Sequence, residues 1–318
     1  METQKKLGGC SRCKNEAIIE LPYVSEKLCG TCFIKFFEKR VRRTIRRHDL
    51  LDPCDKTAIA LSGGKDSMAV LSILAGLSKK APKSELFAII VNEGYPGYRD
   101  SLLKTAEEYC KRLGVPLHVI EFKSEFGLTI PEIIDKTKEK ELTMPPCSYC
   151  GVFRRHLLNL KARELGATKI VTGHNLDDEC QTGLMNFLRG DALKIGRSGA
   201  LVGAISDAGF VPRIKPLRDT PEDEIELYTK LLEIPTAYGK CPYARDSIRT
   251  RLGEFLKSFE SDYPGTRYQT LSSIDGLSKF LKESLVENKV TLEKCETCGE
   301  PSSRGICQFC QLKSDIGL

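Results

Sequence analysis

The amino-acid sequence predicts an α/β protein built on a doubly wound, mainly parallel sheet. In the middle of the chain, short apolar runs typical of buried strands alternate with longer segments whose apolar residues recur at helical spacing. The first of these runs breaks into a Ser62-Gly63-Gly64 turn directly before a helical segment. Strands and helices that alternate in this way form βαβ units, and 318 residues suffice for one such domain with small appendages.

The apolar runs predict five buried strands. They are expected at 57–61, 85–91, 117–122, 168–172 and 211–217. Helices are expected from Asp66 to Leu77, over 100–113 and 153–165, after Gly173, and from Thr220, where Thr-Pro-Glu-Asp is typical of a capped helix start. Two more are expected near 246–260 and 267–284. The glycine-rich stretch from Gly190 to Gly209 is interpreted as an irregular, mobile cover of the site.

The composition favours a cytoplasmic protein. No apolar run approaches the roughly 20 residues that span a membrane, and the first ten residues do not lead into the apolar region of a signal peptide. We therefore expect no membrane association. In a reducing compartment, the fourteen cysteines need an explanation other than disulfides.

Eight of the cysteines form two groups, one near each end of the chain. The first is Cys10-x2-Cys13 with Cys29-x2-Cys32, and the second is Cys295-x2-Cys298 with Cys307-x2-Cys310. Four thiolates complete a tetrahedral zinc shell, so we predict two structural Zn²⁺ ions. Disulfides or iron–sulfur clusters are the alternatives. The expected domains are an N-terminal zinc module (1–34), a basic helix and linker (35–55), the central α/β domain (56–245), C-terminal helices (246–290) and a C-terminal zinc ribbon (291–318).

The glycine-rich turn has the sequence Ser-Gly-Gly-Lys-Asp-Ser over residues 62–67. Glycines let the backbone approach an anion closely, and the first amides of the following helix lack intrahelical partners. Ser67 and the first three residues of the turn would donate to a phosphate, Lys65 would add a positive charge, and Asp66 would reach Mg²⁺ directly or through water. The spacing differs from that of Walker A. The alternative is a simple turn in which Asp66 or Ser67 caps the helix.

Two further segments follow predicted strands, at the edge where open α/β sheets bind ligands. Residues 92–100 come after the second strand, and Gly-His-Asn-Leu-Asp-Asp-Glu comes after the fourth, at 173–179. The acids and the histidine of the second segment are candidates for catalysis. Asn175 and Asp177 alternatively cap the following helix, which leaves Asp178 or His174 for another role.

The most positive stretch of the chain is 33–47, where seven Lys or Arg residues stand against one Glu and the apolar residues form a stripe. This pattern predicts a helix whose basic side contacts a nucleic-acid backbone. A solvated helix face is the alternative, although such faces normally mix both signs of charge. The candidate contacts are Arg40, Arg42, Arg43, Arg46 and Arg47.

Three of the remaining cysteines have suggestive surroundings. Cys147 and Cys150 form a third CxxC pair with no second pair nearby, and Cys241 stands directly before a proline. A close pair with a distant Cys-Pro is a common arrangement of iron–sulfur ligands, and three thiolates would leave one iron of a cubane free for an exogenous sulfide. A persulfide or disulfide cycle and inert buried thiols are the alternatives. The cysteines without partner spacing are interpreted as packing residues: Cys54, Cys110 and Cys180.

These motifs, in this order, resemble those of one family over nearly the whole chain. The S-G-G-K-D-S turn is similar to the PP-loop of the N-type ATP pyrophosphatases. With the two four-cysteine groups, P-P-C-S-Y-C-G at 145–151, G-H-N-L-D-D-E-x-Q at 173–181 and the later C-P-Y, the chain resembles the tRNA 2-thiolation enzymes of the TtcA/TtuA group. Within that group it most resembles the archaeal and eukaryotic cytoplasmic tRNA wobble-uridine thiolases.

The resemblance implies a sulfurtransferase that uses ATP to adenylate the C2 oxygen of a tRNA uridine, releases pyrophosphate, and then inserts sulfur with release of AMP. It implies that Cys147, Cys150 and Cys241 hold an iron–sulfur cluster, [4Fe-4S] or [3Fe-4S], and that Asp178 is a catalytic acid or positions a metal. A homodimer and a sulfur donor are also implied, the donor being sulfide, a cysteine desulfurase or a ubiquitin-like carrier. The implied nucleotide-binding residues are Ala60, Ser62, Gly63, Gly64, Lys65, Asp66, Ser67, Val91, Gly173 and His174.

The same resemblance leaves alternatives for the target and the reaction. Where some relatives are expected to have a lysine after the CxxC pair, this chain has Arg154 and Arg155. Arginine does not lose its proton, so acid–base chemistry there is doubtful. His156 is a candidate substitute, and the favoured alternative is that it is simply a histidine on the helix surface. We expect wobble uridine 34 as target, with T-loop uridine 54 as the alternative. Adenylation followed by a nitrogen nucleophile and a non-catalytic zinc-ribbon RNA-binding protein are the remaining alternatives.

Overall fold

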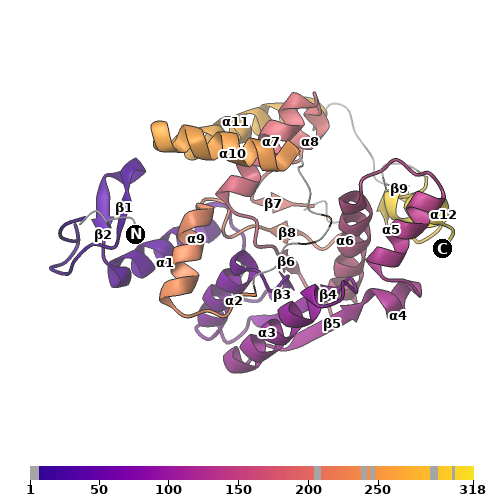
Figure 1. Cartoon of the computed structure of the whole chain (residues 1–318), viewed down its shortest axis with the longest axis horizontal. Helices are drawn as coiled ribbons and strands as arrows, with labels where there is room; N and C mark the ends of the chain where they lie inside the picture. Colours follow the sequence, from indigo (N-terminus) through magenta and orange to yellow (C-terminus); the bar gives the residue numbers. More distant parts are fainter. Residues whose placement is uncertain are drawn as a thin grey trace.

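The computed structural model describes residues 7–203, 209–237, 241, 243, 248–286, 293–302 and 305–318. Its centre is a six-stranded sheet in the order β5-β4-β3-β6-β8-β7 (Figure 1). The strands run parallel, as predicted, except that β7 pairs antiparallel with β8 at one edge. The strands are β3 (Lys56–Leu61), β4 (Glu85–Asn92), β5 (Leu117–Glu121), β6 (Lys169–Val171), β7 (Leu201–Val202) and β8 (Arg213–Ile214).

Helices cover both faces of this sheet, because alternate residues of the central strands point to opposite sides. Ile59 and Ile90 belong to one core, which also includes buried residues of α1, α2, α3 and α9. Ala58 and Ile89 belong to the other, with α5, α6 and the C-terminal cysteine module. The bounds are α1 (Gly30–Arg47), α2 (Lys65–Ser78), α3 (Tyr98–Leu113), α4 (Phe122–Phe126), α5 (Ile130–Glu139), α6 (Pro146–Glu164) and α9 (Glu222–Leu231).

A separate group of helices packs beyond the β7 edge of the sheet (Figure 1). It consists of α7 (Leu176–Leu188), α8 (Ala192–Gly196), α10 (Ile248–Asp262) and α11 (Thr266–Val286). Gly183 permits the close approach of α7 and α11, since a Cβ at this position would lie 2.1 Å from Cδ1 of Ile274. α10 also packs against α7, and Arg249 of α10 lies beside Asp178 near the start of α7.

The two cysteine modules lie at opposite ends of the molecule in Figure 1. The N-terminal module comprises β1 (Ile19–Leu21), the short 3-10 helix η1 (Pro22–Val24) and β2 (Glu26–Leu28), and it runs directly into α1. The C-terminal module comprises β9 (Glu293–Lys294), β10 (Pro301–Ser302) and α12 (Gln308–Ile316). Among the residues described, no helix is both long and apolar enough to cross a membrane.

Several local predictions differ from the structure. The strand expected at 211–217 is only Arg213–Ile214, because Pro212 and Pro216 offer no N–H to a neighbouring strand. The helix expected from 153 begins at Pro146, so the CxxC pair lies in its first turns. Residues 190–209 include α8 and β7, and 204–208 lie outside the described residues. Thr220 is not a helix cap: α9 begins at Glu222 after Pro221, and the Thr220 hydroxyl is buried without a partner in the described structure.

Candidate active site

The glycine-rich turn between β3 and α2 is held open by its own serines. Ser67 accepts a hydrogen bond from the backbone N–H of Ser62 (3.1 Å) and donates to the carbonyl of Gly64 (3.0 Å). Gly63 has φ +81°, and a Cβ there would lie 2.9 Å from Leu102. Gly64 is the residue before α2, and no side chain caps this helix. The alternative interpretation, in which Asp66 or Ser67 caps the helix, is therefore wrong. The amides at the start of α2 are available to an anion.

A cavity of about 460 Å³ opens at this turn, on the edge where β3, β4 and β6 end. We call it the catalytic cavity. Its volume is within the range of about 300–1,000 Å³ typical of small-molecule sites. Gly63, Gly64 and Lys65 do not line it. The sequence-predicted residues that do are Ala60, Ser62, Asp66, Ser67, Val91, Gly173, His174 and Asp178.

Gly173 explains why the end of β6 lies so close to the turn. A Cβ at this position would be 2.9 Å from the backbone nitrogen of Ser67, a distance at which neighbouring backbone would have to move. The close approach brings His174 to the cavity, where its Nδ1 lies 2.8 Å from the Thr172 hydroxyl. Desolvation within the cavity and the nearby Lys215 lower the pKa of His174 to about 4, so its imidazole is neutral at physiological pH.

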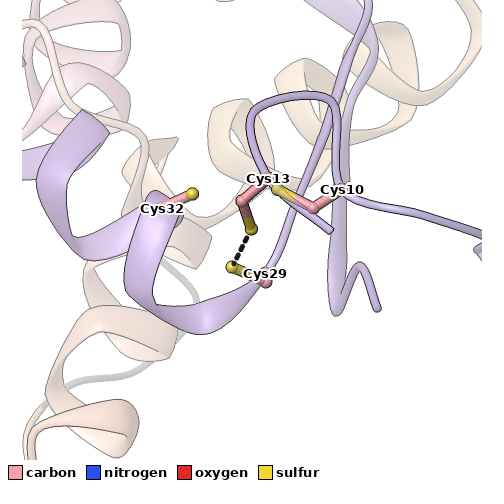
Figure 2. Close-up of side chains that lie close together, drawn as sticks. All are labelled: Cys10, Cys13, Cys29 and Cys32. Atoms are coloured by element: carbon pink, nitrogen blue, oxygen red, sulfur yellow. Dashed lines mark hydrogen bonds between the residues drawn. The ribbon is translucent and has the colours of Figure 1, made fainter. Parts of the chain in front are cut away.

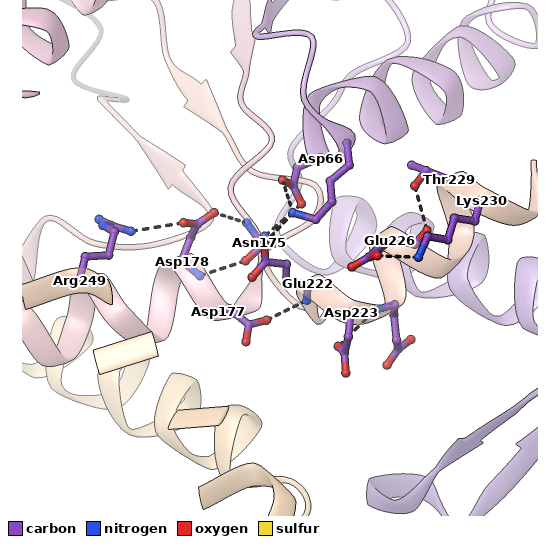
Figure 3. A network of polar contacts seen from close by, with 12 residues as sticks. Asp66, Asn175, Asp177, Asp178, Glu222, Asp223, Glu226, Thr229, Lys230 and Arg249 are labelled. Carbon is purple, nitrogen blue, oxygen red and sulfur yellow. Dashed lines mark hydrogen bonds and ion pairs between the residues drawn. The ribbon is translucent and has the colours of Figure 1, made fainter. Parts of the chain in front are cut away.

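Acidic side chains surround the start of α2 (Figure 3). Lys65 does not point into the cavity but forms ion pairs with Glu222 (2.6 Å) and Asp66 (3.2 Å). Although burial opposes its charge, these acids raise the pKa of Lys65. Asp66 accepts a hydrogen bond from the Asn175 side chain (3.1 Å), and burial raises the pKa of Asp66.

Asp178 has two structural partners besides its place in the cavity. Asn175 caps α7, which confirms the suggestion that it is a helix cap. It forms a reciprocal capping box with Asp178. Arg249 of α10 lies 3.3 Å from the Asp178 carboxylate and also donates to the Thr182 hydroxyl (2.8 Å). Burial raises the pKa of Asp178, while Arg249 opposes this rise. Asp177, the other suggested cap, instead accepts the backbone N–H of Glu222 (2.8 Å).

Glu93 connects the glycine-rich turn to the helix that carries the CxxC pair. It is 2% exposed and forms ion pairs with Arg99 and with Arg154 of α6, the latter at 3.2 Å. Arg99 in turn donates to the carbonyl of Ser62 (3.1 Å) and to that of Val91 (2.8 Å). A single buried carboxylate, that of Glu93, therefore links the glycine-rich turn, the end of β4 and α6.

The three central cysteines converge on a pair of tyrosines. The Cys147 thiol lies 3.8 Å from the Tyr243 carbonyl, and the Tyr243 ring centroid lies 5.8 Å from that of Tyr95. Tyr95 is hydrogen-bonded to Cys241 and is also close to Cys150. Burial raises the pKa of Cys150 to about 11, so this thiol needs a metal or a cation to ionise. The neighbouring residues 238–240, 242 and 244–247 are outside the described part of the chain.

The three central thiols are less tightly gathered than those of the terminal modules. Among the described residues, the thiols gathered within 4.8 Å of one another are those of the two terminal modules, not the central three. Cysteines that bind different irons of one cluster lie further apart than cysteines that share one ion. Arg154 and Arg99 are close enough to Cys150 to favour its thiolate, which suits a site with three negatively charged ligands.

Each terminal module brings four thiols together, as the spacing predicted. A tetrahedral ion with Zn–S bonds of about 2.3 Å requires sulfurs about 3.8 Å apart, and the Cys13–Cys29 pair is separated by 3.5 Å (Figure 2). The Cys298–Cys307 pair is separated by 3.6 Å. Cys29 and Cys307 precede α1 and α12, where helix-start amides stabilise thiolates. The backbone N–H of Cys307 contributes to lowering the pKa of Cys295 to about 6.

The basic segment is helical, but one of its candidate RNA contacts is wrong. Arg40 is 4% exposed, and it forms an ion pair with Glu224 (2.9 Å) and contacts the Tyr23 hydroxyl. It points inward because Glu224 lies on α9, which packs against α1. Arg42 is partly exposed and pairs with Glu38 (3.0 Å). The exposed candidates are Arg43, Arg46 and Arg47.

The sequence interpretation missed several residues of the catalytic cavity. Arg213 and Lys215 both line it, and their separation by one residue on a predicted strand was a signal that they share a face. Arg155 also lines the catalytic cavity. The sequence indicated only that this residue cannot act as an acid or a base, and did not place it in the site. Arg249 could not have been found in this way, because it reaches Asp178 from 71 residues further along the chain.

Known proteins resemble this chain over nearly its full length. The profile of the PP-loop domain family matches residues 35–255. The tRNA 2-thiolation protein NcsA of Haloferax volcanii is 38% identical, with 96% of this chain and 98% of the relative covered. The tRNA-5-methyluridine(54) 2-sulfurtransferase of Pyrococcus horikoshii is 32% identical over 97% and 96%. The solved U34-tRNA thiolase NcsA from Methanococcus maripaludis, with its [4Fe-4S] cluster, is 33% identical, with a TM-score of 0.82 and coverage of 98% and 97%.

Proposed function

We propose that this chain, which belongs to the PP-loop family of tRNA 2-thiolation proteins, uses ATP to replace the C2 oxygen of a tRNA uridine with sulfur. The target we propose is the wobble uridine 34, since the U34-tRNA thiolase shares the fold at a TM-score of 0.82. The observation that carries the proposal is the Glu93 link, because it joins a phosphate-binding turn to a helix with two thiols.

The first step activates a poor leaving group. The C2 oxygen attacks the α-phosphorus of ATP, the bond to the β-phosphate breaks, and pyrophosphate leaves. The open amides at the start of α2 and the Ser62 and Ser67 hydroxyls bind the departing pyrophosphate. Lys65 adds its charge to this group only after leaving Glu222. Asp66, with Asp178 nearby, would hold Mg²⁺, which supplies charge neutralisation when bound.

The second step is substitution at C2. A hydrosulfide adds to C2, and AMP leaves with the former C2 oxygen. Cys147, Cys150 and Cys241 would hold a [4Fe-4S] cluster, which supplies sulfide in deprotonated form beside the adenylated base. Arg154 keeps its proton and remains paired with Glu93, so its role is electrostatic. Asp178 lines the cavity, and its role is that of a catalytic acid or of a group that positions the metal.

The remaining partners and metals complete the proposal. We infer one Zn²⁺ in each four-cysteine module and a homodimer in the cytoplasm. The sulfur donor is sulfide, a cysteine desulfurase or a ubiquitin-like carrier. Arg43, Arg46 and Arg47 contact the tRNA backbone, with Arg42 at the margin, and the domain bounds expected from the sequence are retained as part of the proposal.

Anaerobic reconstitution tests this function. The protein is incubated with iron, sulfide, ATP and tRNA, and the nucleosides are separated by mass. We expect 2-thiouridine together with one AMP and one pyrophosphate per product. AMP formation without a thiolated nucleoside would instead favour a nitrogen nucleophile, and tRNA binding without pyrophosphate would favour a non-catalytic RNA-binding protein.

The 32% identity to a uridine-54 sulfurtransferase favours position 54 as a second candidate target. The two positions are separated by digesting the product tRNA with a ribonuclease and weighing the fragments. Sulfur in the anticodon-loop fragment supports position 34. Sulfur in the T-loop fragment contradicts it and leaves the chemistry of the proposal unchanged.

A further inference from the structure

A second cavity lies between α6 and the C-terminal module. It has a volume of about 230 Å³ and is lined by Val152, His156 and Asn159 of α6 and by Phe309 of α12, among others. Arg155 and Arg213 also line it, and both of them line the catalytic cavity as well. The two cavities therefore share these two arginine residues.

The positive charges of the two shared arginines are not paired with a carboxylate in the described part of the chain. Within the described residues, neither forms an ion pair or a hydrogen bond that would satisfy its guanidinium. Glu300 is the carboxylate that lines the second cavity. It is already paired with Arg163 (2.5 Å) and accepts a hydrogen bond from the Asn159 amide (2.9 Å). Burial and the nearby Arg155 lower the pKa of Arg213. Two like charges at one boundary are stabilised by an anion placed between them.

The second cavity is too small for a drug-sized ligand, since its volume lies below the range of about 300–1,000 Å³, but its walls carry aromatic side chains that suit a single base. Phe309 is buried, and its ring stacks on that of His156 with centroids 3.7 Å apart, so the rings that a base can reach are those of His156 and Phe210, which are partly exposed. Unstacked RNA bases bind to such rings.

We propose that this second cavity, the flanking-nucleotide pocket, binds the tRNA nucleotide next to the target uridine, and that Arg155 and Arg213 bind the phosphodiester between the two. The inference rests on the proposed function, since it places the target uridine in the catalytic cavity. Adjacent nucleosides are joined by one phosphate. When each occupies one cavity, that phosphate lies at the boundary, where the two arginines stand. The same chemistry would also suit a phosphate of ATP, so the experiment separates the two sources.

The test begins with the double variant Arg155→Gln/Arg213→Gln in the anaerobically prepared holoprotein. Affinity for fluorescent tRNA and for ATP is measured at several salt concentrations. We expect tRNA affinity to fall about tenfold or more and the slope of log K against log salt to become shallower by roughly 0.7–0.9, as for one lost phosphate contact. ATP affinity should stay the same. Lys161→Gln is the matched control, because Lys161 lies on α6 but pairs with Glu164.

A chemical change in the RNA identifies the phosphate. An anticodon stem-loop is prepared with a neutral methylphosphonate on one side of uridine 34, then on the other. One of these should weaken binding to the unaltered protein yet have no further effect on the double variant. Additive losses, unchanged tRNA affinity or a selective loss of ATP affinity would overturn the proposal. Because binding is measured without turnover, a failure of thiolation alone would count against the proposed function and not against this pocket.

Discussion

The terminal four-cysteine modules and the central three-cysteine site differ in how many thiols the described structure gathers closely together. In each module four thiols lie within 4.8 Å of one another, and one CxxC pair begins a helix that belongs to a core. The central site has one exposed thiol, Cys147, and it is linked through Glu93 to a cavity. A complete shell leaves an ion no free position, so it stabilises the fold. An incomplete shell beside a cavity leaves a position for chemistry.

Cys150→Ala should produce the largest effect on activity and almost none on folding. Loss of one ligand removes the cluster, and we expect thiolation to fall by roughly 10⁴-fold, the scale seen when one member of a catalytic unit is removed. Nucleoside mass analysis and iron content measure this loss. Compared with the cluster-free unaltered protein, so that loss of the cluster is common to both, thermal unfolding should show a stability change within about 1 kcal/mol. Cys54→Ala is the control, since Cys54 is an exposed cysteine outside every group. A variant that retains iron and activity would show that the central site is not a cluster site.

Cys29→Ala should reverse this pattern. The variant is expected to lose one zinc ion and on the order of 4 kcal/mol of unfolding free energy, because loss of a metal is among the few substitutions that reach this size. The effect should extend into the fold, since Cys29 precedes α1 and Phe37 of α1 stacks on Tyr228 of α9 at 4.1 Å. Metal analysis and denaturant unfolding check it. Iron content should stay unchanged, and a parallel loss of iron would contradict the separation of the two kinds of site.

Glu93→Gln should weaken the link between the two halves of the active site. The substitution keeps the shape but removes the charge that holds Arg99 and Arg154. Residues that orient a metal's surroundings typically contribute roughly 10–100-fold, and we expect a fall of about 30-fold in kcat with little change in KM for ATP. Glu132→Gln is the matched control, because Glu132 forms an exposed pair with Lys123. An equal fall in kcat for both variants would remove the positioning role of Glu93.

Patterns within a few residues of one another were predicted correctly from the sequence. The CxxC spacing predicted both four-cysteine groups, and the glycine turn with its flanking periodicity predicted β3 and α2. The reason is physical: ligand spacing and helix periodicity act over one or two turns. The cap at Asn175 was likewise visible, because a cap and its partner are three residues apart.

Contacts between distant segments could not be predicted in this way. In the sequence, Arg40 cannot be distinguished from the other basic residues of its helix. The fold shows that it is buried and donates a hydrogen bond to Glu224, 184 residues later in the chain. Lys65 was expected to face a phosphate, but it pairs with Glu222, 157 residues away. Charge alone does not reveal a partner, since any exposed acid or base is equally compatible with solvent. The active site is most dependent on such contacts, so it was the least completely predicted.

The smallest expected effect is on the pH dependence of stability. It concerns a contact between α6, which carries two of the central cysteines, and the C-terminal cysteine module. His156 lies on α6, which begins with the CxxC pair, and its ring stacks on Phe309 of the C-terminal module. Burial lowers the pKa of His156, with help from Arg163 and Lys313 and against Glu300. The folded pKa is thus below the unfolded value of about 6.5, so the unfolded chain binds a proton that the folded chain does not.

The stability that His156 contributes is therefore complete above about pH 6.5 and is lost as the pH falls towards its folded pKa. We expect the loss between about pH 7 and about pH 5.5 to be below about 1 kcal/mol, because the ring is only partly buried. His156→Phe keeps the stack and removes the titration, so its urea midpoint should vary less with pH. Zinc content is measured in the same samples, since thiolate sites also release metal in acid. An identical pH slope in both proteins, at constant zinc, would mean that His156 contributes nothing to the pH dependence of stability.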